Sequence, residues 1–209
     1  MKRQGVLLVV SGPSGVGKGT IISEVMRRHP DVRRSISCTT RVPRPGEVDK
    51  RDYFFIGADE FAHLRDSGRL LEWAVVHQDL FYGTPREPVE EALAEGCDII
   101  LEIDYQGARS VRGLLGDRAT LVFIAPPQWD ALAERLEGRS TEDKEATRKR
   151  LASAVHELAH VELFEYLIVN DDLAAATDGL EAILMAERTQ VNRLDWRPFV
   201  DGLLREAGQ

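Results

Sequence analysis

The sequence predicts an α/β protein with a doubly wound core of about five parallel strands, a mixed-β insertion and a helical lid. Three features of the chain support this fold class. An apolar strand near the start leads through a glycine-rich loop into a helix, apolar strands alternate with helical segments after residue 85, and short strands follow one another closely between residues 37 and 85. Alternation is typical of parallel βαβ units, whereas closely spaced short strands favour a smaller antiparallel or mixed sheet.

The first strand is expected at residues 6–10, an unbroken apolar run of the kind that is buried on both faces of a sheet. The run ends just before Gly12. Gly12, Gly15 and Gly17 allow backbone N–H groups to turn inward around an anion, and Lys18 adds a positive charge at the start of the next helix. This stretch therefore predicts a phosphate-binding loop.

The spacing of Gly12, Gly17 and Lys18 matches the loop that binds nucleoside triphosphates. The next position departs from the strict pattern, because Gly19 stands where a hydroxyl group would serve Mg²⁺, and Thr20 follows one residue later. A plain turn between a strand and a helix is the alternative interpretation. The apolar strand before the loop and the helical apolar spacing after it favour the phosphate loop.

Composition narrows the class of protein. With 209 residues and 43% hydrophobic content, the chain is long enough for one sizeable core. A net charge of −8 and a pI near 5.2 argue against a general nucleic-acid or membrane-surface role, which needs a basic face. Cys38 and Cys97 have no metal-type spacing, and no apolar run approaches the ~20 residues of a membrane span or forms a signal peptide. We therefore expect a cytoplasmic protein with no nucleic-acid or membrane partner.

The helix after the loop is expected from Lys18 to Arg28, because Pro30 disfavours helix in the residue before it. A short strand is expected at residues 34–38. Residues 39–47 contain two prolines, a glycine and two arginines, so they predict a charged loop. The other elements expected in the insertion are strands at 53–56, 70–76 and 81–83, and a helix at 59–66 closed by Gly68.

Regular alternation resumes at Thr84 and Pro85, a pattern typical of a helix cap followed by a first-turn proline. The strand at 98–104 ends with Glu102 and Asp104, at the edge where parallel sheets bind ligands. Strands are also expected at 120–124 and 166–169. Helices are expected at 84–95, 106–115, 128–137, 173–192 and 197–206, and a further long helix runs from a break at 138–141 to about residue 162.

These elements divide the chain into three parts. Residues 1–36, 86–127 and 152–209 form the expected core, residues 37–85 the insertion, and residues 128–151 an arginine-bearing lid. No internal repeat is visible.

Several motifs together resemble the guanylate kinase family, whose members phosphorylate GMP with ATP. The resemblance extends from Val9 to about Arg188 and is far more specific than the phosphate loop alone. The motifs are residues 12–20 (GPSGVGKGT), Ser37 with Thr39-Thr40-Arg41-x-Pro43-Arg44-x-Gly46-Glu47, Asp52-Tyr53-x-Phe55, Glu72-Trp73-Ala74, Tyr82-Gly83-Thr84, Glu102-Ile103-Asp104-x-Gln106-Gly107, Arg135-Leu136-x-x-Arg139, Lys149-Arg150-Leu151 and Val169-Asn170-Asp171-Asp172.

The resemblance implies an ATP site built on the phosphate loop. The residues it assigns there are Gly12, Pro13, Ser14, Gly15, Val16, Gly17, Lys18, Gly19, Thr20, Arg139 and Asn170. Arg139 and Arg150 are similar to lid arginines that close over the transferred group. Arg135 and Arg148 are weaker candidates, because a charged helix face is the default interpretation of arginines in this segment. The expected catalytic residues are Lys18, Arg41, Asp104, Arg139 and Arg150.

The resemblance also implies a GMP site in the insertion. The residues assigned to it are Ser37, Arg41, Arg44, Tyr53, Glu72, Tyr82, Thr84 and Asp104. Arg41 and Arg44 can hold a monophosphate with forked donors, although a solvated loop is the alternative. The Glu72 carboxylate can accept hydrogen bonds from N1–H and the 2-amino group of guanine, and the Thr84 hydroxyl can donate to O6. The alternative interpretation of Glu72 is an exposed glutamate on a strand. The alternative interpretation of Tyr82 is an ordinary packed aromatic side chain.

Phosphoryl transfer depends mainly on positioning and charge neutralisation, so we expect Lys18 at the β/γ-phosphates and Mg²⁺ bridging the same oxygens. We expect Mg²⁺ as the cofactor, held through the ATP phosphates and water. No protein metal ligand is assigned, and the histidines show no zinc-type pattern. The expected reaction converts GMP, and dGMP as well, to the diphosphate in purine nucleotide metabolism, with no obligate protein partner.

Three other functions remain open from the sequence. A kinase for another small molecule should lack the Glu72 and Thr84 pair, and a catalytically silent binding module should have lost Lys18 and the loop glycines. A nucleic-acid-dependent ATPase would need a basic face. One departure from the family affects residues 72–82, which lack a common glycine and contain one extra residue, so the turn before Tyr82 is not specified.

Overall fold

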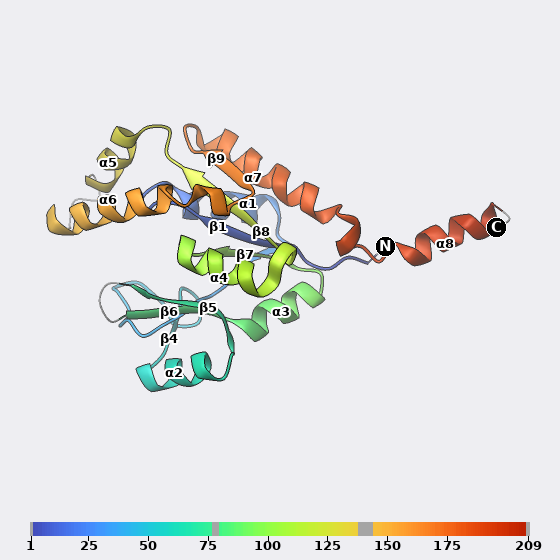
Figure 1. The fold of residues 1–209 in the computed structure, drawn as a ribbon, viewed down its shortest axis with the longest axis horizontal. Coiled ribbons are helices and arrows are strands. Elements are labelled where there is room, and N and C mark those ends of the chain that lie inside the picture. The colour runs from blue at the N-terminus through green and yellow to red at the C-terminus, as the bar shows by residue number, and fades with distance from the viewer. Residues whose placement is uncertain (1, 77–79, 138–143, 208–209) are drawn as a thin grey trace.

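The computed structural model describes residues 2–76, 80–137 and 144–207, and it contains two sheets with helices around them (Figure 1). The larger sheet has five strands in the order β2-β7-β1-β8-β9, and every pair of neighbours is parallel. This confirms the predicted α/β class with a parallel core of five strands. Its strands are β1 (Leu7–Ser11), β2 (Val32–Arg34), β7 (Asp98–Glu102), β8 (Ala119–Ala125) and β9 (Tyr166–Val169).

Helices cover both faces of the larger sheet, with α7 on one side and α3 and α4 on the other (Figure 1). The helices are α1 (Lys18–Arg28), α3 (Arg86–Ala94), α4 (Tyr105–Leu115), α5 (Trp129–Glu137), α6 (Lys144–Leu158), α7 (Leu173–Arg188) and α8 (Arg197–Glu206), with 3₁₀ turns at Gly116–Arg118, Val161–Leu163 and Val191–Arg193. None of the helices in the described part of the chain has the length and apolar character needed to cross a membrane.

The side chains of β1 explain why its sequence is uniformly apolar. Leu8 and Val10 pack in one buried cluster with residues of α1 and α7, whereas Leu7 and Val9 pack in a second cluster with residues of α3 and α4. A strand covered on both faces has no polar side, since successive side chains point to opposite faces. The phosphate loop therefore begins at the end of the most deeply buried strand of the sheet.

The smaller sheet has four strands in the order β4-β3-β6-β5. It combines a parallel β3/β4 pair with antiparallel β3/β6 and β5/β6 pairs, so the predicted mixed pairing is confirmed. Its elements are β3 (Cys38–Thr39), β4 (Phe54–Phe55), β5 (Leu70–Val76), β6 (Leu80–Pro85) and helix α2 (Ala58–Asp66). Phe61 of α2 fills the small core beneath this sheet with Cys38 and Leu70.

The predicted strand at residues 34–38 is wrong. Val32–Arg34 pairs with β7 in the large sheet, and Cys38–Thr39 pairs with β4 and β6 in the small one. The chain changes sheets between them, so the two halves of the predicted strand belong to different layers.

The predicted cap at Thr84 is also wrong. Thr84 and Pro85 complete β6, α3 starts at Arg86, and the helix has no side-chain cap. The Thr84 hydroxyl instead donates to Glu72, which explains why it does not cap the helix.

Many other predicted elements differ from the structure by about one residue at an end, and three were extended further past their true C-terminal end. The strand before α4 ends at Glu102, because Asp104 caps that helix. Helix α6 ends at Leu158 and α7 at Arg188, and a 3₁₀ turn follows each.

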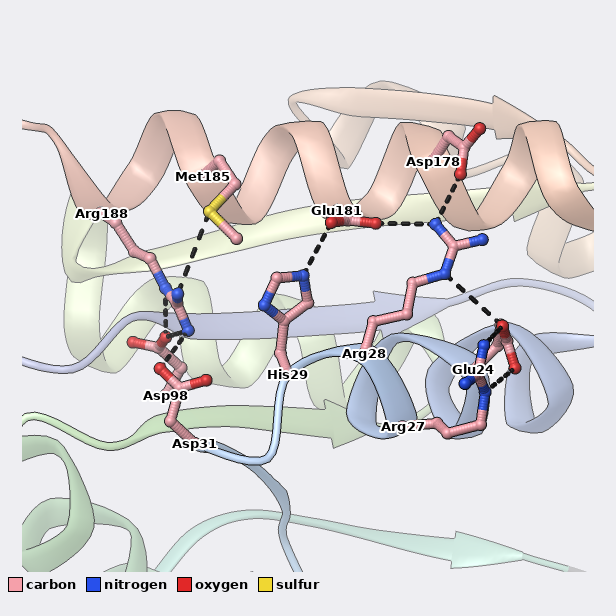
Figure 2. A network of polar contacts seen from close by, with 10 residues as sticks. All are labelled: Glu24, Arg27, Arg28, His29, Asp31, Asp98, Asp178, Glu181, Met185 and Arg188. Atoms are coloured by element: carbon pink, nitrogen blue, oxygen red, sulfur yellow. Dashed lines mark hydrogen bonds and ion pairs between the residues drawn. The ribbon is translucent and has the colours of Figure 1, made fainter.

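A network of charged side chains joins the end of α1 to α7 (Figure 2). Arg28 donates to Asp178 and Glu181, and the His29 ring lies 2.8 Å from the same Glu181 carboxylate. Since α1 begins at the phosphate loop, these contacts fix the far end of the helix that positions the loop.

Asp98, at the start of β7, lies at the centre of a second group of charges. Its side chain is only 1% exposed, accepts from the backbone N–H of Val6, and pairs with both Arg3 and Arg188 (Figure 2 shows the Arg188 contact). Arg188 also reaches Asp31, whose side chain is half exposed. This group ties the N-terminal segment to the end of α7.

The N-terminal segment also pairs with the segment that precedes α8. Arg3 and Leu194 form an antiparallel bridge, the backbone N–H of Gln4 donates to the Arg193 carbonyl, and that of Asp195 donates to Lys2. Helix α8 then extends away from the rest of the molecule (Figure 1), and none of its residues, all of which are described, is buried.

Candidate functional site

The glycine-rich loop between β1 and α1 has a backbone that requires glycine. Gly12, Gly15 and Gly17 all have positive φ. A Cβ at Gly12 would lie 2.1 Å from the Ile124 carbonyl oxygen, so this glycine lets the loop rest against β8. The sequence-predicted phosphate loop is therefore present as a tight backbone cradle at the N-terminus of α1.

Lys18 is the first residue of α1. Its ammonium group donates to the carbonyl oxygens of Gly12 and Pro13, which belong to the loop itself. The positive charge is thus held over the loop, at the end of the helix where the macrodipole already favours anions. This arrangement suits an anionic ligand with several oxygens.

Asn170 lies beneath the loop, immediately after β9. It is buried, and its side-chain amide donates to the Val16 carbonyl at 2.7 Å. A Cβ at Gly17 would lie 2.5 Å from the same amide nitrogen. In this structure Asn170 therefore supports the loop backbone.

The loop forms one wall of a cavity of about 600 Å³. Its lining combines loop residues with a cation and an acid from the ends of two strands, namely Ser14, Gly15, Gly17, Lys18, Gly19, Thr20, Ser23, Arg34 and Glu102. The cavity lies at the carboxyl edge of the parallel sheet, the usual position of ligand sites in this class of fold.

Glu72 on β5 is an acid in a buried position. It is 6% exposed, and the Thr84 hydroxyl donates to its Oε1 at 2.6 Å. Burial raises the pKa of Glu72 to about 7, the Thr84 hydrogen bond partly opposes this rise, and the charge of Asp104 adds to it. A buried carboxylate with a second oxygen available for N–H donors is suited to recognising a ligand by paired hydrogen bonds.

Glu72 needs the glycine that faces it. A Cβ at Gly107, in the first turn of α4, would lie 2.8 Å from Glu72 Oε2. The neighbouring cavity of about 150 Å³ is lined by Ser37, Tyr53, Glu72, Ala74, Tyr82, Glu102, Ile103 and Asp104. Five of the residues that the sequence assigned to the acceptor site therefore surround one space.

Arg41 is already paired. Its guanidinium makes two hydrogen bonds to the Glu47 carboxylate, at 3.0 and 2.8 Å, and its Nε donates to the Tyr82 hydroxyl at 3.0 Å. The backbone N–H of Arg44 donates to the same carboxylate, while the Arg44 side chain is exposed. Arg41 holds the pKa of Glu47 below its usual range, so the loop carries an internal anion where an external phosphate was expected.

Comparison with known proteins identifies the family. A family model described as "Guanylate kinase" matches residues 4–187, which is most of the chain. The chain belongs to the guanylate kinase family. This confirms the resemblance seen in the motifs.

Among curated relatives named guanylate kinase, that of Gloeobacter violaceus is 52% identical over 87% of this chain and 87% of its own length. The relative from Symbiobacterium thermophilum is 48% identical over 92% of this chain and 90% of its own. A crystal structure of guanylate kinase from Anaplasma phagocytophilum superposes with a TM-score of 0.78 at 32% identity, covering 95% of this chain and 94% of that one. The chain is thus similar to guanylate kinases along nearly its whole length.

Several residues assigned from the resemblance to guanylate kinases already have protein contacts or are partly buried in this structure. Asp104 caps α4, because its Oδ1 accepts from the Gly107 N–H at 2.8 Å, so one of its oxygens is already occupied. Arg150 lies on α6 and is partly buried, and Arg135 on α5 donates to the Val16 carbonyl at 3.4 Å. Arg139 lies outside the described residues.

Sequence reasoning missed Arg34 and gave Glu102 and Glu47 no definite role. Arg34 donates to Glu102 at 2.6 Å across 68 positions of sequence, so no local pattern could reveal the pair. It also missed Glu157, which is buried on α6, accepts from Ser153, and has a pKa raised by burial and opposed by the charge of Lys18. Glu157 continues the row of Leu151 and Ala154 at a spacing of three, and an acid in an apolar row of a helix was a usable signal in the sequence.

Mg²⁺ prefers oxygen ligands, and the residues lining the loop cavity carry such groups, namely the hydroxyls of Ser14, Thr20 and Ser23 and the carboxylate of Glu102. Within the described ranges, no three His, Cys, Asp or Glu residues are grouped so that they could hold a metal ion. The donors that do line the cavity fit a magnesium ion that arrives with phosphate oxygens and water.

Proposed function

We propose that this protein transfers the γ-phosphoryl group of ATP to the phosphate of GMP, giving ADP and GDP. The observation that supports this most is the buried Glu72 carboxylate, paired with Thr84, in a cavity that shares Glu102 with the phosphate-loop cavity. A GMP molecule with its base at Glu72 and an ATP molecule with its phosphates at Lys18 would bind in neighbouring cavities, on the two sides of Glu102. We extend the proposal to dGMP, to a role in purine nucleotide metabolism and to a cytoplasmic location.

Base recognition follows from the chemistry of Glu72. Guanine presents N1–H and a 2-amino group side by side, and a carboxylate can accept from both, whereas adenine offers no such pair. The single Thr84 proton is donated to Glu72 in this structure, so it would have to turn to reach the guanine O6. Leaving buried polar groups unpaired is what makes such a site reject the wrong base.

The phosphate groups would be held by cations from helix α1 and from the loop between β3 and β4. Lys18 and the loop N–H groups would bind the donor phosphates, and Arg41 and Arg44 the acceptor phosphate, with Ser37, Tyr53 and Tyr82 adding hydroxyl groups. An oxygen of the acceptor phosphate attacks the γ-phosphorus while the bond to the β–γ bridging oxygen breaks. Mg²⁺ bound with ATP would supply charge neutralisation at these oxygens, and Thr20 and Glu102, which line the loop cavity, would hold it.

We further propose that residues 37–85 and 128–151 close over the bound nucleotides, with Arg139 and Arg150 reaching the transferred group. Exclusion of water protects ATP from hydrolysis, and an open cleft is needed to admit two nucleotides. X-ray scattering of the protein, alone and with GMP and a non-hydrolysable ATP analogue, tests this. A smaller radius of gyration in the complex supports closure, and identical profiles contradict it.

A coupled assay with GMP, dGMP, AMP and UMP as acceptors tests the function directly. We expect turnover with GMP and dGMP, and a rate lower by about 10⁴ or more with the other two. Glu72→Gln should abolish most GMP turnover and leave ATP affinity intact, because a donor then faces a guanine proton. Equal turnover of all four acceptors, or an equal loss with each of them in the variant, would overturn the role of Glu72.

A further inference from the structure

The space beside Gly19 contains the carboxylate of Glu102. A Cβ built at Gly19 would lie 3.8 Å from Glu102 Oε2, which is an ordinary contact distance. In the strict form of the loop, a serine or threonine side chain occupies this position and its hydroxyl serves Mg²⁺. In this chain a carboxylate lies within contact distance of that position.

The Glu102 carboxylate is held in place by Arg34. Arg34 ends β2 and Glu102 ends β7, and these strands are parallel neighbours, so both side chains leave the carboxyl edge of the sheet. The guanidinium of Arg34, which is 47% exposed, donates to Oε2 of Glu102, which is 20% exposed, at 2.6 Å. The oxygen fixed by Arg34 is the same one that faces Gly19.

The position of the pair is more informative than its strength, since a half-exposed ion pair adds little stability. Both residues line the phosphate-loop cavity with Lys18 and Thr20, and Glu102 also lines the cavity of Glu72. Asp104, the other acid at this edge, already has one oxygen on the α4 backbone. Glu102 is thus the acid that borders both spaces.

We propose that Arg34 and Glu102 together replace the hydroxyl that Gly19 lacks, with Arg34 orienting the Glu102 carboxylate and Glu102 accepting hydrogen bonds from the water shell of Mg²⁺ bound with ATP. The proposal rests on the proposed use of ATP. Mg²⁺ keeps several waters in nucleotide sites, so an acid that holds those waters serves as well as a direct ligand. A guanidinium beside the carboxylate favours this indirect role, because it reduces the charge available for direct ligation.

The test measures how strongly metal and nucleotide binding are coupled, independently of turnover. ATP binding is measured by calorimetry with saturating Mg²⁺ and with chelator, and Mn²⁺ affinity for the protein–ADP complex by electron paramagnetic resonance. Groups of this kind usually contribute about tenfold or more to metal affinity, so we expect Glu102→Gln to weaken Mn²⁺ binding about tenfold and Arg34→Gln to weaken it by a smaller factor. ATP binding with chelator should change little in Glu102→Gln.

Arg33→Gln is the matched control. Arg33 precedes Arg34 on β2 and is exposed, but Arg34 is the residue that donates to Glu102. The substitution Arg33→Gln removes the same charge as Arg34→Gln. Its Mn²⁺ affinity should equal that of the wild type. An equal loss in Arg33→Gln and Arg34→Gln would mean that only the total charge matters, and would overturn the positioning role.

A rescue variant makes the test decisive. Gly19→Ser, added to Glu102→Gln, supplies the hydroxyl of the strict loop pattern at a position where a Cβ fits without a clash, and should restore most of the lost Mn²⁺ affinity. If Glu102→Gln does not fold, as judged by thermal unfolding, Glu102→Asp, which shortens the side chain and keeps its charge, takes its place in both measurements. Unchanged Mn²⁺ affinity in the folded variant, or no gain from Gly19→Ser, contradicts the proposal. If the wild type phosphorylates GMP but the variants leave Mn²⁺ affinity unchanged, this inference alone fails. Absence of GMP turnover in the wild type would instead refute the proposed function.

Discussion

Thr84 donates a hydrogen bond of 2.6 Å to Glu72, and both side chains are buried between β5, β6 and α4. The hydroxyl stabilises the charged form of an acid that burial would otherwise protonate. Removing it should therefore affect the acid more than the fold.

Thr84→Val keeps the shape of the side chain and removes the donor. We expect the pKa of Glu72 to rise above about 7 and kcat/KM for GMP at pH 7 to fall about tenfold, because a hydrogen bond to a charged group is lost. Part of the loss should return at higher pH, where the carboxylate is ionised. Steady-state kinetics between pH 6 and 9 measure this, with the exposed Thr189→Val as control. A pH-independent loss would exclude the effect on Glu72.

The raised pKa of Glu72 also makes stability depend on pH. The Glu72 carboxyl loses its proton near pH 4.5 in the unfolded chain and near pH 7 in the folded protein. Its contribution to the free energy of unfolding is therefore fully present below about pH 4.5 and is lost as the pH rises to about 7. The shift corresponds to about 3 kcal/mol. Glu72→Gln, which cannot ionise, should thus be more stable than the wild type at pH 8 by up to about this amount, with little difference at pH 4.5. Urea unfolding of the ligand-free proteins at both pH values checks this, and a difference independent of pH would contradict it.

Arg41 must leave Glu47 before it can bind a phosphate with both of its terminal nitrogens. Glu47→Gln weakens this internal pair while keeping an oxygen that can accept from the Arg44 backbone. We expect GMP to bind more tightly in this variant, by up to about fivefold, since the side chains of the pair are 9% and 21% exposed and an ion pair that solvent still reaches contributes about 1 kcal/mol or less. Affinity for guanosine, which has no phosphate, should not change. Calorimetric titrations with both ligands measure this, and Glu60→Gln on the exposed face of α2 is the charge-matched control. Weaker GMP binding would indicate that Glu47 organises the loop for binding.

Asp98 should be essential to the fold and irrelevant to nucleotide chemistry. Asp98→Asn leaves Arg3 and Arg188 beside a neutral buried group, so we expect a loss of about 3–5 kcal/mol in the free energy of unfolding. Asp31→Asn alters the exposed end of the same network and should cost less than about 1 kcal/mol. Urea titrations compare the two, with GMP kinetics on the folded fraction expected to be unchanged. Equal losses would show that burial of Asp98 does not set its importance.

The core of this fold was predictable because each of its signals is local. The apolar run of β1 and the helix from Lys18 to Arg28 depend on neighbouring residues, and the structure confirms both. The strand predicted at 34–38 was wrong because the sheet that each residue joins depends on its partner strand. Arg34 pairs with β7 and Cys38 with β6, and both partners lie more than forty positions away in the sequence.

The sequence predicted those parts of the candidate site in which the type of side chain alone indicates its role in binding. Glu72, Tyr53 and Ser37 do line one cavity. The sequence could not indicate that Arg41 is occupied by Glu47 or that Thr84 donates to Glu72, since these pairings depend on which side chains the folded backbone brings together. The contact of Arg34 with Glu102 depends likewise on the order of strands in the sheet.

The bridge between Arg3 and Leu194 brings the start of the chain next to the segment that precedes α8. Residues 3–194 consequently form an almost closed ring, which contains both sheets and leaves α8 outside. If residues 196–209 are removed, a short linker between Asp195 and Lys2 would complete that ring, and new ends placed in the exposed turn Gly116–Arg118 would interrupt no strand of either sheet. The fold is therefore suited to circular permutation, with the phosphate loop moved to the middle of the rearranged chain.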